Sequence, residues 1–193
     1  MSYRVIVALA SLLLMSVFAG VALFGARLAD GRLAESLESE ARRLKTAYEL
    51  SQGELEQQMM ALAGTIAADP ETIRLMRAAG EAVAAEGGAA GGARAAAVRA
   101  ALAAHRQQQW DYLQREVGVR QMQYLLPDLT SFLRFHAPTQ FGDSLGELRY
   151  LLRNVEELRQ VASGFETGRA FAGIRGAAPV LDRLPDGREN LVG

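Results

Sequence analysis

The sequence predicts an α+β fold with three parts: an N-terminal transmembrane helix, a long second helix, and a mixed α/β module with an antiparallel sheet. Three observations support this prediction. An uncharged apolar run opens the chain, one apolar stripe follows at helical spacing, and short alternating segments between turn residues fill the C-terminal part. We therefore divide the chain into residues 1–27, 28–118 and 119–193.

The uncharged run covers residues 5–26 and consists mainly of Leu, Val, Ala and Phe. About 20 apolar residues span a hydrocarbon core of roughly 30 Å, so this run predicts one transmembrane helix. A cleaved signal peptide is the alternative. The run exceeds the usual apolar region of about 7–15 residues, and no clear small-x-small cleavage site follows it. We therefore predict an uncleaved membrane anchor.

The basic residues that flank this run give conflicting signals about orientation. Arg4 and the terminal amine precede the run, as in a signal anchor whose N-terminus stays inside. Five basic residues follow it: Arg27, Arg32, Arg42, Arg43 and Lys45. Counted literally, the positive-inside rule places this C-terminal side in the cytoplasm. The charges alone leave the orientation open.

A single apolar stripe predicts a long helix from the membrane to about residue 68. Its members recur at steps of three, four and seven: Leu33, Leu37, Leu44, Tyr48, Leu55, Met59, Leu62 and Ile66. Asp69 ends the helix because a residue before proline avoids the helical region. We expect a homodimer through this stripe, and packing of the helix only on its own domain is the alternative.

Two further helices are predicted before residue 119. Asp69 caps the first, with Pro70 at its first position, and this helix reaches about Glu86. The glycine-rich residues 87–97 read as a flexible connector, since no Gly-Lys-Ser/Thr follows to form a phosphate loop. The next helix covers about residues 95–116, with His105 on its solvated surface and Trp110 in the core or an interface.

The C-terminal part predicts two strands, a helix and a further hairpin. Residues 120–126 and 131–136 alternate as strands, and Pro127 starts a turn between them. Residues 144–147 have capping-box spacing and open a helix that ends near Gly164. Just before it, Asp143 is expected to act as an N-terminal cap.

Residues 170–181 then predict a strand, and the turn at 185–187 leads to another strand that begins at Leu191. Because so short a second arm would leave an open edge, we expect the α/β module to be C-terminally incomplete.

The composition excludes several functions. The net charge is −1, from 21 basic and 22 acidic residues, which excludes nucleic-acid binding through clustered positive charge. Cysteine is absent, so thiolate metal sites and cysteine nucleophiles are excluded. Two histidines are too few for a multi-histidine metal site. We expect neither a metal nor a cofactor.

Residues 122–193 carry an ordered set of motifs: 131–136 (SFLRFH), Pro138, 141–143 (FGD), Leu145, Arg149, 164–166 (GFE), 168–169 (GR), 173–176 (GIRG) and 179–180 (PV). This pattern resembles the double Cache (dCache_3-like) extracytoplasmic sensor domains that precede chemoreceptor, diguanylate cyclase and histidine kinase outputs. Ser144 stands where the family commonly has a second Asp, and Phe171 and Ala172 alter the approach to the GIRG motif.

The resemblance implies a bacterial inner-membrane protein that senses a small molecule and takes part in signal transduction, for example in chemotaxis. It implies a cytoplasmic N-terminal tail, a long extracytoplasmic helix and a periplasmic Cache-like module. A second membrane span and a cytoplasmic output would follow. It therefore favours a periplasmic C-terminal region over the literal charge count.

Six residues are candidate ligand contacts. Arg134 and His136 share one face of their predicted strand, and Arg149 and Arg175 come from neighbouring elements. Converging cations favour an anionic ligand held by charge-assisted hydrogen bonds, with Tyr124 and Phe132 as apolar walls. The alternative is structural: Arg134 pairs with Asp143, and Arg175 pairs with Glu166, to fix loops around the sheet.

Two other classes of function were weighed against a sensor. An enzyme is not expected, because Ser131 lies on the same strand as His136 and no nucleophile-elbow motif is present. A structural or adaptor protein, in which the coiled-coil stripe is the function and no small molecule binds, is the alternative that stays open. The ligand and the output domain are not specified by the sequence.

Overall fold

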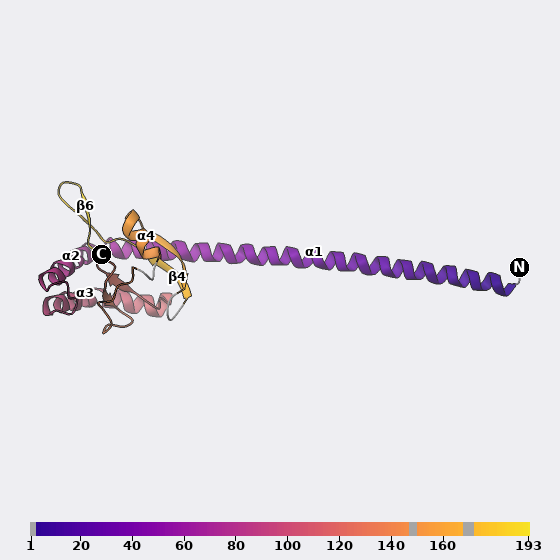
Figure 1. The fold of residues 1–193 in the computed structure, drawn as a ribbon, viewed down its shortest axis with the longest axis horizontal. Helices are drawn as coiled ribbons and strands as arrows, with labels where there is room; N and C mark the ends of the chain where they lie inside the picture. Colours follow the sequence, from indigo (N-terminus) through magenta and orange to yellow (C-terminus); the bar gives the residue numbers. More distant parts are fainter. Residues whose placement is uncertain (1–2, 147–149, 168–171) are drawn as a thin grey trace. The chain divides into compact units, whose positions relative to one another are not determined.

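The computed structural model describes residues 3–146, 150–167 and 172–193 (Figure 1). The chain divides into two compact units, Met1–Gln52 and Gly53–Gly193. Helix α1 (Tyr3–Ala67) contributes to both units. It ends one residue before the expected end at residue 68.

The first unit contains the part of α1 that was predicted to enter a membrane. The segment Tyr3–Arg27 is long and apolar enough to cross a bilayer. Its large side chains are exposed, with Leu13 and Phe18 each 68% exposed. Further along the same unit Leu37, Leu44 and Tyr48 are also exposed. These three stripe residues of the first unit are therefore uncovered, whereas Ile66, in the second unit, packs against the core.

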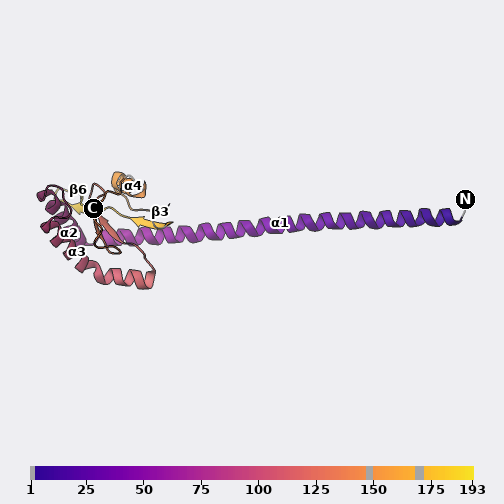
Figure 2. The same ribbon diagram turned by 60° about the horizontal axis from the view of Figure 1, so that its bottom comes forward.

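Two helices follow in the second unit, α2 (Pro70–Ala85) and α3 (Ala93–Tyr112), and they pack side by side (Figure 2). Asp69 caps α2 as predicted: the Thr72 N–H donates to its Oδ2 at 2.8 Å, and Pro70 occupies the first helical position. The buried face of α2 includes Leu75, Met76 and Ala79, which contribute to the core.

The glycine-rich segment between α2 and α3 is a closed turn rather than the expected flexible connector. The Glu86 carboxylate reaches across it and accepts hydrogen bonds from the backbone N–H groups of Arg94 (2.7 Å) and Ala95 (3.1 Å). These bonds satisfy donors that the first turn of α3 would otherwise leave free. A Cβ at Gly92 would collide with this carboxylate, so a larger residue there would displace the Glu86 side chain from the amides that it caps.

Helix α3 begins two residues before the expected position and passes into a π-helical turn, Leu113–Val117. Gly118 then takes a left-handed conformation with φ 77°, which ends the helical region where the sequence predicted. Trp110 is buried, as expected, with its ring centroid 5.9 Å from that of Phe135.

The predicted first strand pair is present but shorter. Strand β1 (Gln123–Leu125) pairs antiparallel with β2 (Ser131–Arg134), with Tyr124 opposite Leu133. Ser131, Phe132 and Leu133 are all buried, so both faces of β2 are covered. Phe132, Met76 and Leu102 are among the fully buried side chains at the centre of the core.

The expected end of the next helix at Gly164 is wrong. Helix α4 (Tyr150–Leu158) stops earlier, and Arg159 takes a left-handed conformation with φ 54°. Gly164 instead lies in β3 (Ala162–Thr167), opposite Arg175 of β4 (Ala172–Ala177). Strand β3 shows no clear alternation and depends on pairing with β4, which the sequence does not display. The expected cap of α4 falls partly on residues 147–149, outside the described residues.

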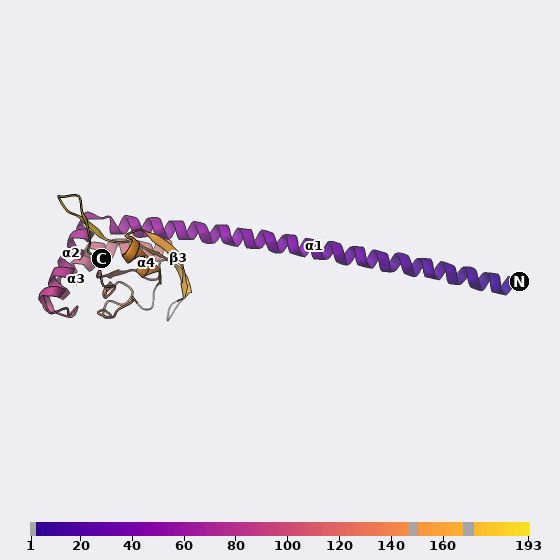
Figure 3. The same ribbon diagram turned by 45° about the horizontal axis from the view of Figure 1, so that its top comes forward.

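The predicted strand over residues 170–181 is two strands, β4 and β5 (Leu181–Arg183). They are separate because Val180 pairs with the chain end: the Val192 N–H donates to the Val180 carbonyl at 2.9 Å. The predicted turn at 185–187 is confirmed, and it joins β5 to β6 (Glu189–Leu191). The described strands form three two-stranded antiparallel sheets (Figure 3).

Candidate functional site

Arg134, at the end of β2, lies in an ion pair. Its Nη1 is 2.8 Å from Asp143 Oδ1, and its Nη2 donates to Asp143 Oδ2 at 2.8 Å. Nη1 also donates to the Gln140 carbonyl at 3.1 Å. The Arg134 side chain is 11% exposed and that of Asp143 is 54% exposed. The structural alternative predicted for this arginine is therefore the observed geometry.

The same pair closes the loop that follows β2. The Gly142 N–H donates to the Ser131 carbonyl at 2.7 Å, and the Ser131 N–H donates to the Asp143 carbonyl at 2.9 Å. Asp143 was expected to cap a helix. The start of that helix includes residues 147–149, which lie outside the described residues. The Asp143 carboxylate binds Arg134, and the loop over residues 135–142 is held at its base.

His136 follows Arg134 and is partly buried. Burial is the largest cause that lowers the pKa of His136; the Met122 backbone opposes this shift, and the Arg134 charge adds to it. Its Nδ1 is buried and has no hydrogen-bond partner among the described residues. A neutral imidazole with a free ring nitrogen is able to accept or donate one hydrogen bond to a bound molecule.

Tyr124 and Phe132 were expected to line a pocket, and the structure places both in the core. Tyr124 is 6% exposed, and its ring meets Phe135 edge-on at a centroid distance of 6.4 Å. Burial raises the pKa of the Tyr124 hydroxyl. Phe132 is fully buried.

Arg175 lies on a different sheet from Arg134. Its Nε is 3.6 Å from Glu166 Oε2, and its Nη1 donates to Gln121 Oε1 at 3.4 Å. Glu166 Oε1 also accepts the Leu151 N–H at 3.0 Å, which ties the start of α4 to β3. This is the second structural pair that the sequence offered. Arg149, the remaining predicted contact, lies outside the described residues.

Arg99 of α3 was not predicted as a site residue. It is 7% exposed, and its Nε donates to the Phe132 carbonyl at 2.7 Å. Its Nη2 donates to the Ala90 carbonyl. The guanidinium carbon lies 4.8 Å from the centroid of the Phe132 ring and 3.6 Å from that of Phe141. Phe132, of the motif at 131–136, and Phe141, of the motif at 141–143, thus enclose this cation.

Arg106, on the same face of α3, joins three helices. Its guanidinium donates to the Thr72 hydroxyl (2.8 Å from Nε) and to the Ile66 carbonyl (3.0 Å from Nη2). Its Nη2 also lies 3.0 Å from Asp69 Oδ2. The end of α1, the cap of α2 and the middle of α3 therefore meet at one buried guanidinium.

His105 was expected to be a solvated surface residue, and the structure gives it a partner. Its Nε2 lies 2.9 Å from Asp69 Oδ2, and its side chain is 30% exposed. Partial burial of Asp69 would raise the pKa of its carboxyl. Hydrogen bonds from His105 and from the Thr72 backbone and side chain, together with the Arg106 charge, outweigh burial and lower this pKa to about 2.

Arg99 and Arg106 were missed because arginine is rarely buried, so neither was read as a core position. The signal was their spacing, since four residues at steps of three and four share one buried face of α3: Arg99, Leu102, Arg106 and Trp110.

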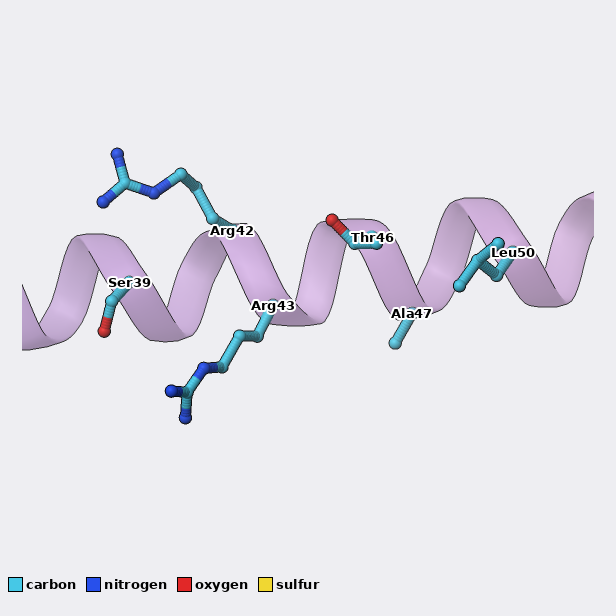
Figure 4. A pocket seen from close by; sticks show the side chains of 6 residues that line it. All are labelled: Ser39, Arg42, Arg43, Thr46, Ala47 and Leu50. Atoms are coloured by element: carbon cyan, nitrogen blue, oxygen red, sulfur yellow. The ribbon is translucent and has the colours of Figure 1, made fainter.

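Two hollows lie apart from these residues. One, of about 240 Å³, is lined by Met76, Arg77, Gly80, Glu81, Pro127, Asn190, Leu191 and Val192. The other is a shallow surface along one stretch of α1, and Figure 4 shows that all its side chains come from this single helix: Ser39, Arg42, Arg43, Thr46, Ala47 and Leu50. Neither hollow contains a predicted ligand contact. Within the described ranges, no cluster of three or more His, Asp or Glu side chains is placed to hold a metal ion.

A family model described as the double sensory domain of two-component sensor kinases, dCache_3, matches residues 71–188. The matched range begins within α2, well before the motifs at residues 122–193, and includes Arg99, Arg106, Arg134, His136 and Arg175. No curated protein and no solved structure matches the chain. More than half of the chain is therefore assigned to one family.

Proposed function

Because the chain belongs to the dCache_3 family of double sensory domains, we propose that it is a membrane-anchored periplasmic input domain for transmembrane signalling. The family match over residues 71–188 is the observation that carries this proposal. The family description names two-component sensor kinases, which favours a kinase output over a chemoreceptor or a diguanylate cyclase.

The membrane part of the proposal depends on the segment Tyr3–Arg27, which is long and apolar enough to span a bilayer. We assign it as an uncleaved anchor with the N-terminal tail in the cytoplasm, because a family of extracytoplasmic sensors needs its sensory region outside. Substituted-cysteine labelling tests this directly, since the chain has no cysteine of its own. In intact cells a membrane-impermeant maleimide should label Glu157→Cys but not the matched tail variant Ser2→Cys.

A small ligand, with an anion as the favoured class, is the proposed signal. Of the six predicted contacts, His136 has the most suitable geometry, because its buried Nδ1 lacks a partner among the described residues. Arg134 and Arg175 already pair with carboxylates, so a ligand anion would compete with Asp143 or Glu166 for them.

A homodimer through α1 is the proposed route of the signal. Leu37, Leu44 and Tyr48 are 62%, 64% and 65% exposed, and a second copy of the chain would cover them. Ligand binding would bias the dimer between two arrangements of this helix, as expected for a two-state signalling element.

The test is a thermal-unfolding screen of the full chain in lipid nanodiscs, followed by the fluorescence of Trp110. The library is weighted toward organic acids and amino acids. A ligand that binds the folded state raises the midpoint once its concentration exceeds Kd, and the stabilisation grows with the logarithm of that concentration. A cooperative transition that no compound shifts, in a chain that still dimerises through α1, would favour a structural or adaptor protein instead.

A further inference from the structure

Arg99 is a buried cation that no carboxylate neutralises in the part of the chain that the structure describes. Its partners there are two backbone carbonyls, of Phe132 and Ala90, and two aromatic rings, of Phe132 and Phe141. Carbonyl dipoles and ring faces stabilise a guanidinium, but they carry no net charge. Among the described residues, the positive charge of Arg99 therefore has no counter-ion.

Three other buried or partly buried arginines differ from Arg99 in this respect. Arg106, Arg134 and Arg175 each lie beside a carboxylate, of Asp69, Asp143 and Glu166 respectively. A buried charge without a counter-ion is strongly unfavourable in a protein interior. Consistent with this, burial lowers the pKa of Arg99. An anion from outside the chain would relieve this cost.

The surroundings of Arg99 suit a small anion. The guanidinium has five N–H donors, and the two hydrogen bonds described for it use Nε and Nη2. Nη1 has no hydrogen-bond partner among the described residues. Small residues lie next to the outer ring of Phe141: a Cβ on Gly91 would be 3.9 Å from that ring, and a Cβ on Gly142 would be 3.9 Å from that of Ala90. Phe141, whose ring lies against the guanidinium, is 36% exposed.

We propose that Arg99 is the anchor for the sensed ligand and that the ligand is an organic carboxylate. This inference rests on the proposed sensory function. The guanidinium fork matches the planar geometry of a carboxylate, and the face of Phe141 offers an apolar surface for the carbon skeleton. Arg99 already bridges the turn after α2 and strand β2, so a bound carboxylate acts on both elements at once.

The experiment uses the full chain in phosphatidylcholine nanodiscs in Tris chloride. Acetate, succinate and benzoate are titrated against it by calorimetry, with benzamide as the neutral counterpart of benzoate and sulfate as an inorganic anion. We expect saturable binding of at least one carboxylate and none of benzamide. Arg99→Gln should weaken that binding at least tenfold, and Arg99→Lys, which keeps the charge but loses the fork, should weaken it less.

Arg115→Gln is the matched control, because Arg115 is an exposed arginine that donates only to the Asp111 carbonyl at 3.2 Å. It should leave the affinity unchanged. If Arg99→Gln does not fold, hydrogen exchange on the unaltered chain replaces it: benzoate should slow exchange at the amides of residues 91–92 and 141–142, and benzamide should not.

Three results overturn the inference. The first is sulfate binding as tightly as the carboxylates, because equal affinity indicates a general anion site. The second is that none of the carboxylates binds to the unaltered chain. The third result is a ligand from the wider screen that binds the Arg99 variants as tightly as the unaltered chain. In that case the sensory function stands and only the Arg99 anchor fails.

Discussion

Arg99 and Arg106 are the same residue type on the same face of one helix, two turns apart, and the protein treats them differently. Arg106 has a carboxylate, a hydroxyl and a helix-terminal carbonyl as partners. Arg99 has two carbonyls and two rings. The first set completes a structural joint between three helices. The second holds the side chain in place and leaves its charge available, so burial alone does not tell a structural arginine from a functional one.

The largest expected effect is the difference in unfolding free energy between a substitution of Arg106 and the same substitution of Arg99. Arg106→Met should lower the free energy of unfolding by about 3 kcal/mol, because it leaves Thr72, the Ile66 carbonyl and Asp69 without their shared donor. Arg99→Met should cost only about 1 kcal/mol, since the loss of two hydrogen bonds is offset by removal of an uncompensated charge. Urea unfolding of the full chain, followed by Trp110 fluorescence, measures both.

Equal costs for the two substitutions would contradict this comparison. They would mean that Arg99, like Arg106, is held in the folded chain by interactions that fully offset the desolvation of its charge.

Asp69, the carboxylate beside Arg106, should make the stability of the folded chain depend on pH in the acid range. The pKa of Asp69 is lowered from 3.8 to about 2 in the folded chain. Its stabilising contribution is therefore complete above about pH 4 and is lost as the pH falls toward 2. Because the side chain is 29% exposed, screening reduces this contribution to about 1–2 kcal/mol.

Asp69→Asn isolates this contribution, because asparagine still caps α2. The variant should be less stable than the unaltered chain at pH 6, and the difference should shrink as the pH approaches 2. Urea unfolding at a series of pH values measures the gap. A gap that stays constant from pH 6 to pH 2 would show that the Asp69 charge does not stabilise the cluster.

The smallest expected effect belongs to Arg134, which is paired like Arg106 but with a carboxylate that is exposed at the surface. A double-mutant cycle of Arg134→Gln and Asp143→Asn should give a coupling free energy of about 0.5–1 kcal/mol, because the Asp143 side chain is 54% exposed. The coupling should decrease in 0.5 M NaCl. A coupling free energy above that range that does not change with salt would show that the Arg134–Asp143 pair behaves as a buried ion pair, like that of Arg106.

Local signals in the sequence were sufficient to predict where much of the helical region begins and ends. The Asp69-Pro70 start of α2 and the glycine at 118 depend only on backbone preferences of single residues, and both were predicted correctly. Strand β3 was missed, and the end of α4 misplaced, because Gly164 has its partner eleven residues away in β4. Pairing over that distance is not encoded in a short window of sequence.

The candidate site shows the same division between local and tertiary information. The motifs at 131–136 and 141–143 identified the loop that Arg134 and Asp143 close, and even offered the pair itself. They did not identify Arg99, which contributes to the same loop from 33 residues upstream of the Phe132 carbonyl that it binds. A charged residue on an alanine-rich helix looks solvent-exposed until the strand that covers it is known.

The turn between α2 and α3 has a consequence for how this segment can change over evolution. Its composition, rich in glycine and alanine, suggests a linker whose length is free to vary. The Glu86 carboxylate, however, must reach the amides of Arg94 and Ala95, and Gly92 leaves room for it to do so. The exposed Ala89 is replaceable, whereas Ala90 is buried, and inserting or deleting one residue would detach the cap from α3 and move the Ala90 carbonyl away from Arg99. We therefore expect the length of this segment to be more constrained than its exposed residues.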